Sequence, residues 1–134
     1  MTTHHAALIH TMVLMAAADR DMTDAEMASI GDMEAHLPVF RDYDRSKIAS
    51  TAAGCIDALG KENGLDRLIK EIKAALPEKL RETAYALACD VAAADGKVTQ
   101  EEARLLELLR FGLGIGRLPA AAIERGARAR HLTV

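Results

Sequence analysis

A chain of 134 residues, half of them apolar, can bury a core without disulfides. Aromatic residues make up only 3% and Trp is absent, which favours closely packed helices built from Ala, Leu, Ile and Met over a β-sandwich. The net charge is −3, and the eight carboxylates from Asp19 to Asp44 share that stretch with only Arg20 and Arg41. This acidic first half argues against nucleic acid as the main partner.

The N-terminal segment predicts two helices. Apolar residues at helical spacing form the inward stripe of a first helix that ends near Asp19. A second helix is expected to begin at Thr23 and to end near His36, because the residue before Pro38 disfavours continued helix.

The middle of the chain predicts two more helices. Asp44 or Ser46 is expected to cap a third helix that stops at Gly60. Residues 65–76 place Leu and Ile at positions i, i+3, i+4, i+7 and i+11, which is typical of an amphipathic fourth helix.

Three helices are expected in the rest of the chain. Pro77 fits the first turn of a fifth helix, which runs to Asp95. Thr99 opens a sixth, which closes within residues 112–116, and a short seventh follows Pro119. The sequence therefore predicts an all-α fold: one compact domain over residues 1–134 with six to seven helices.

One motif occurs twice, in residues 16–26 and 92–102, with the shared pattern A-A-A-D-x-x-(apolar)-T-x-x-E. The copies start 76 residues apart, and each lies between two apolar helical stretches. We therefore expect a duplicated helix–turn–helix unit with internal pseudo-twofold symmetry, rather than a stacked array of repeats.

The T-x-x-E part of each copy has a structural interpretation. Thr23 with Glu26, and Thr99 with Glu102, match the capping box that opens a helix. Gly96 can supply the left-handed backbone that ends the preceding helix.

The Asp of each copy is not explained in this way. Asp19 and Asp95 fall at the C-terminal ends of their predicted helices, where the helix dipole disfavours a carboxylate. Each precedes the Glu of its copy, Glu26 or Glu102, by seven residues across the turn. Converging carboxylates can hold a hard divalent cation, calcium or magnesium rather than zinc, although the spacing is not that of an EF-hand.

Asp90 interrupts an otherwise apolar segment, where a carboxylate has to be paired, bound to a cation or turned to solvent. An internal bond to an Arg or to a neighbouring helix end is the favoured interpretation, and a ligand role is the alternative.

Two cysteines, Cys55 and Cys89, lie within apolar helical patterns and are expected to be buried thiols. The start of the chain does not resemble a signal peptide, and no apolar run reaches the length of a membrane helix. A cytoplasmic location without membrane insertion is therefore expected.

Residues 87–102, LACDVAAADGKVTQEE, combine a helix, an A-D-G motif, an apolar residue and a Glu. A weaker copy surrounds Asp19 and Glu26, and a leucine-rich helix ends at Gly114. This pattern resembles the TerB-like family of tellurite-resistance-associated proteins, which includes the TerB-like domain of a membrane-anchored DnaJ-type co-chaperone.

The resemblance implies an all-helical, cytoplasmic protein without catalytic activity that acts in a stress response through protein partners, membrane-associated ones included. It also implies a metal site, and its candidate ligands here are Asp19, Glu26, Asp95 and Glu102, with Asp90 as an extra one. The chain departs from the family pattern at Arg20, where the family usually has Gly.

Two other functions stay open. A helical interaction module without an ion would use the acidic half to bind a basic partner. An enzyme is less favoured, because the chain has no nucleophile elbow, phosphate loop, HExxH or CxxC motif.

Overall fold

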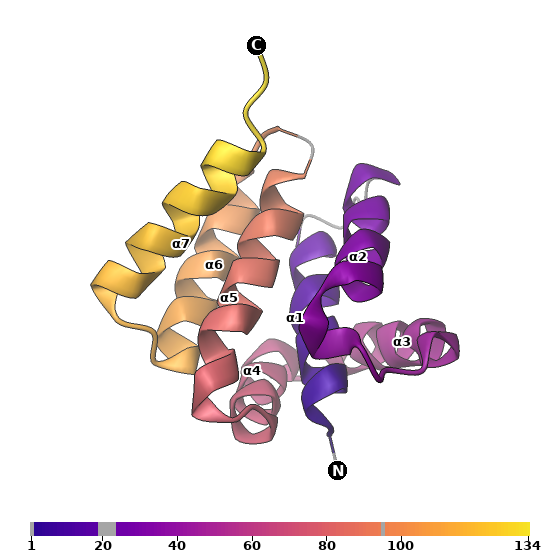
Figure 1. Ribbon diagram of the computed structural model, residues 1–134. Helices are drawn as coiled ribbons and strands as arrows, with labels where there is room; N and C mark the ends of the chain where they lie inside the picture. Colours follow the sequence, from indigo (N-terminus) through magenta and orange to yellow (C-terminus); the bar gives the residue numbers. More distant parts are fainter. Residues whose placement is uncertain (1, 19–23, 95) are drawn as a thin grey trace.

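The computed structural model describes residues 2–18, 24–94 and 96–134, and gives only the backbone of residues 25–27. Over this part of the chain the fold is all-α, with seven α-helices and no strand, as the sequence predicts (Figure 1). The helices are α1 (His4–Ala16), α2 (Asp24–His36), α3 (Ile48–Leu59), α4 (Gly64–Ala75), α5 (Glu78–Ala93), α6 (Gln100–Leu113) and α7 (Arg117–Arg130).

Helix α1 is the centre of the core. It packs against α3, α4 and α5, and also contacts α2 and α6. The sequence predicts one inward stripe on this helix, but nine of its 13 residues are buried, so nearly its whole circumference faces other helices. A helix that is apolar all round can be stable only inside the protein.

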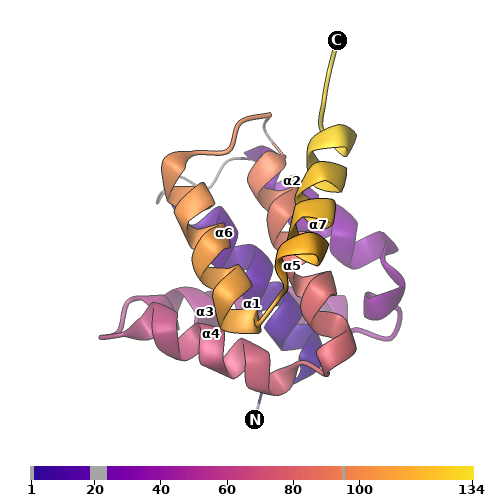
Figure 2. The same ribbon diagram turned by 90° about the vertical axis from the view of Figure 1, so that its left-hand side faces the viewer.

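Helices α3 to α7 surround α1 in two groups, and α2 contacts α1 and α5. Helices α5, α6 and α7 lie side by side and alternate in direction, while α3 and α4 lie across the end of the molecule where the chain begins (Figures 1 and 2). Helix α4 contacts both α1 and α6 and so connects the two halves of the chain.

Several predicted helix ends are confirmed. Helix α3 stops before Gly60, and α4 occupies residues 64–75 against the predicted 65–76. Gly114 ends α6 in the left-handed conformation at φ 71°. The Asp44 carboxylate accepts a hydrogen bond from the Ser46 N–H at 3.0 Å, although it caps a short 3-10 helix that leads into α3 rather than α3 itself.

The prediction for the last helix is wrong. Helix α7 begins at Arg117, two residues before Pro119, and its 14 residues make it as long as α6. Pro119 is tolerated there because the N–H groups of a helix's first turn have no partner within the helix. Among the described residues no helix is both long and apolar enough to cross a bilayer.

Part of the acidic first half is neutralised within the fold. The Glu34 side chain is only 1% exposed, and its Oε2 lies 2.9 Å from Nε of Arg45. The contact is an ion pair without a hydrogen bond to this oxygen. The fold therefore does not present every carboxylate of this stretch to solvent.

We expect His10 to make the protein less stable in mild acid. Burial lowers the pKa of His10, an effect that nearby Glu71 only partly opposes. The unfolded chain therefore binds this proton more readily than the folded protein, and stability falls as the pH drops through the ordinary histidine range, from about pH 7 to about pH 5. Urea unfolding of H10Q should show a weaker loss of stability over that range. Equal pH dependence in the two proteins would contradict this assignment.

Candidate functional site

The turn between α5 and α6 carries the better-preserved copy of the repeated motif. Gly96 adopts the left-handed conformation, at φ 85°, as the sequence predicts. The predicted capping box is also present: the Glu102 N–H donates to Thr99 Oγ1 at 3.1 Å, and the Thr99 N–H donates to Glu102 Oε1 at 3.0 Å. Glu102 is only 3% exposed, so the turn places a carboxylate inside the protein.

Three of the five predicted metal ligands are not placed by the structure. Asp19 and Asp95 lie outside the described residues, as does the side chain of Glu26. The capping box predicted from Thr23 to Glu26 lies outside them as well. Among the residues that are described, no three Asp, Glu, His or Cys side chains come together as a metal centre.

Asp90 makes an internal bond to an arginine, one of the two alternatives that the sequence favoured. Its Oδ1 accepts a hydrogen bond from Nη2 of Arg130 at 2.6 Å, and Nε2 of His131 lies 3.4 Å from the same oxygen. The Asp90 side chain is 19% exposed, so the pair is partly shielded from water. It joins the C-terminal end of α7 to α5.

Both cysteines are buried free thiols, as predicted. Burial raises the pKa of Cys55 and of Cys89 to about 12. Both sulfurs are therefore protonated at neutral pH, which leaves them poor nucleophiles and poor metal ligands.

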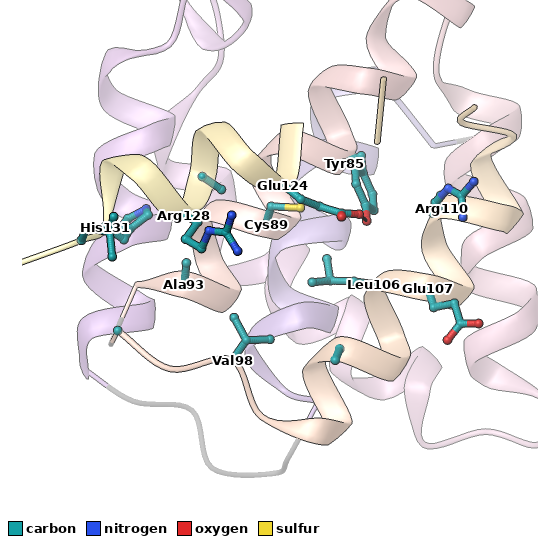
Figure 3. A pocket seen from close by; sticks show the side chains of 14 residues that line it. Tyr85, Cys89, Ala93, Val98, Leu106, Glu107, Arg110, Glu124, Arg128 and His131 are labelled. Carbon is teal, nitrogen blue, oxygen red and sulfur yellow. Dashed lines mark hydrogen bonds between the residues drawn. The ribbon is translucent and has the colours of Figure 1, made fainter. Parts of the chain in front are cut away.

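A half-open cavity of about 530 Å³ lies among α5, α6 and α7 (Figure 3). Cys89 and the buried ring of Tyr85 form part of its wall on α5, and Leu106 projects from α6. Val98, half exposed, and Leu132, largely exposed, also line it. The cavity is thus mainly apolar.

The polar contact inside this cavity joins two helices. The Tyr85 hydroxyl donates to Oε2 of Glu124 at 2.6 Å, across 39 residues of sequence. Burial and this hydrogen bond raise the pKa of Tyr85. The cavity was not predicted from the sequence. Tyr85 is the sequence feature that could have indicated a polar contact between helices here, because a buried tyrosine usually finds a partner for its hydroxyl.

Comparison with known proteins gives one family. The model of the tellurite resistance protein TerB matches residues 5–124, from α1 into α7. No curated protein and no solved structure matches the chain significantly. The matched region contains both copies of the repeated motif and the complete α5–α6 turn. The chain belongs to the TerB family of tellurite resistance proteins.

Proposed function

We propose that this helical TerB domain acts in the tellurite-resistance stress response as a non-enzymatic protein that binds a divalent cation and works through protein partners. The family match over residues 5–124 supports the link to tellurite resistance. The cation is calcium or magnesium rather than zinc, because the proposed ligands are carboxylates and the two thiols are protonated.

The observation that carries the cation proposal is the burial of Glu102. The capping box holds this buried carboxylate at the turn through the hydrogen bond from the Thr99 N–H to Oε1. Asp95 precedes Glu102 by seven residues in the same motif, and calcium and magnesium prefer carboxylate oxygens as ligands. A cation at this turn would add positive charge beside a carboxylate that the fold has already withdrawn from water.

The remaining ligands would come from the other predicted positions. Asp95 and Glu102 are the proposed ligands at the second copy, and Asp19 and Glu26 at the first. Asp90 is not required, because Arg130 already neutralises its carboxylate. Binding of the ion would then make the folding of the two turns depend on the concentration of the cation. Protein partners would recognise the turns in their ordered, ion-bound form.

Two variants separate the capping role from the ligand role at the α5–α6 turn. T99A removes the cap but keeps the carboxylate, so the free energy of unfolding should fall by about 0.5–2 kcal/mol while calcium or magnesium still raises the melting temperature. E102Q keeps a capping side chain but loses the charge, so it should start the helix normally and lose the cation effect. Thermal unfolding of the chelator-stripped variants with and without each ion measures both the loss of stability and the effect of the cation.

The matched control is E62Q, which removes one exposed carboxylate from the α3–α4 loop. It should keep the full cation effect. If E102Q and E62Q respond alike to calcium and to magnesium, Glu102 is not a ligand.

An ion-free interaction module is the second candidate, and the exposure of Asp24, Asp32 and Asp42 favours it. Salt-sensitive capture of a basic protein by this domain in the presence of chelator would support it. D32N combined with D42N should weaken that capture, and unchanged capture would exclude this use of the acidic half.

A further inference from the structure

The cavity among α5, α6 and α7 contains charges that the fold itself does not balance. Two carboxylates and two guanidinium groups line it. Glu107 pairs with Arg104 at 3.7 Å, whereas Glu124 accepts a hydrogen bond from the neutral Tyr85 hydroxyl and keeps its charge, so the two guanidinium groups of the lining exceed its one unpaired carboxylate. In Figure 3 the Glu107 carboxylate points away from Cys89 and Tyr85.

The two arginines have no carboxylate partner among the described residues. Arg110 instead stacks over the ring of Phe111, with Cζ 4.8 Å from the ring centroid. Arg128 lies one helical turn after Glu124 on α7, but no ion pair forms between them. Its side chain lies between His131 and Cys89 at the side of the cavity (Figure 3).

We propose that this cavity binds a single-chain organic carboxylate, with the apolar chain against Cys89, Val98 and Leu106 and the carboxylate at Arg128. The cavity volume of about 530 Å³ lies within the usual range for small-molecule sites, about 300–1,000 Å³. An apolar wall with two guanidinium groups that lack a carboxylate partner suits an amphiphilic anion better than a neutral or cationic molecule.

The carboxylate of Asp90 engages the other basic groups at this end of α7. Arg130 and His131 both lie at the Asp90 carboxylate. Arg128 is therefore the basic residue at this end of α7 whose charge is available to a ligand in the cavity. Because Arg128 is exposed, the headgroup would stay at the cavity mouth while the chain is buried. Neither Glu102 nor Asp90 lines this cavity, and the proposal does not depend on a bound cation.

Calorimetric titration with decanoate, below its micellar concentration, tests the proposal. Decanol and decyltrimethylammonium carry a chain of the same length with no charge or a positive charge. We expect saturable binding of decanoate, at least tenfold weaker binding of decanol, and no binding of the cation. Equal affinity for decanoate and decanol, or no binding of decanoate at millimolar concentration, would overturn the proposal.

Three variants locate the ligand. R128Q should weaken decanoate binding at least tenfold, whereas R125Q, which removes an exposed arginine of the same helix outside the cavity, should not change it. A93L should place a larger side chain in the cavity and abolish binding while the helical circular dichroism stays unchanged. Equal affinities of R128Q and R125Q, or undiminished binding by folded A93L, would place the ligand elsewhere. If the protein self-associates and decanoate does not reverse this, the cavity is occupied by a second copy of the chain. That result would also overturn the proposal.

Discussion

Replacing Leu8 with alanine is expected to lower the free energy of unfolding by about 2–5 kcal/mol. Leu8 is fully buried in α1, the helix that contacts α3, α4 and α5. Truncation removes apolar contacts and leaves a cavity that rigid neighbouring helices close only in part. Urea unfolding followed by circular dichroism measures the change, and an unchanged m-value would show that the two-state transition is preserved.

L118A is the matched control for this experiment. Leu118 lies at the start of α7 and is 80% exposed, so its truncation should change stability by no more than about 0.5 kcal/mol. Similar losses in L8A and L118A would contradict the central place of α1 in the core.

Replacing Gly64 with alanine is the second substitution with a large expected effect. A Cβ at position 64 would overlap the carbonyl oxygen of Ala58 and would lie 3.1 Å from Cα of Leu59. Both atoms are backbone of the last turn of α3, so the α3–α4 connection would have to move. Overpacking of this kind costs about 1–3 kcal/mol, measured as the change in the free energy of unfolding.

G54A provides the opposite result in the same region. Gly54 lies within α3, and nothing stands within 4 Å of the Cβ that alanine would add. Alanine is favoured over glycine in a helix, so G54A should stabilise the protein by about 0.5–1 kcal/mol. A stabilising G64A, or a G54A as harmful as G64A, would contradict the packing of this turn.

The local features of the fold were predictable because they depend on nearby residues. The periodicity of residues 65–76 predicted α4 within one residue at each end. The capping box at Thr99 and the left-handed Gly96 and Gly114 follow from residue types at fixed spacings. The start of α7 was missed because Pro119 is compatible with several positions in a first turn, and the sequence around it does not choose among them.

Features that depend on distant residues could not be predicted in the same way. The sequence favoured an internal bond from Asp90 to an Arg or to a neighbouring helix end, but it did not identify Arg130, which is 40 residues away. The deep burial of Glu34 and Glu102 arises from how the helices pack, and no local pattern shows it. The cavity at Tyr85 likewise requires three helices to meet. The pseudo-twofold duplication and the metal ligands remain predictions from the repeated motif.

We propose that the acidic turns of this TerB domain bind a divalent cation. Calorimetric titration of chelator-stripped protein with calcium, magnesium and zinc tests it most directly, with D19N combined with D95N as the comparison. Saturable binding of calcium or magnesium by the unmodified protein, lost in the double variant, is the predicted result. Absence of binding for every ion, or equal binding by the double variant, would contradict the claim.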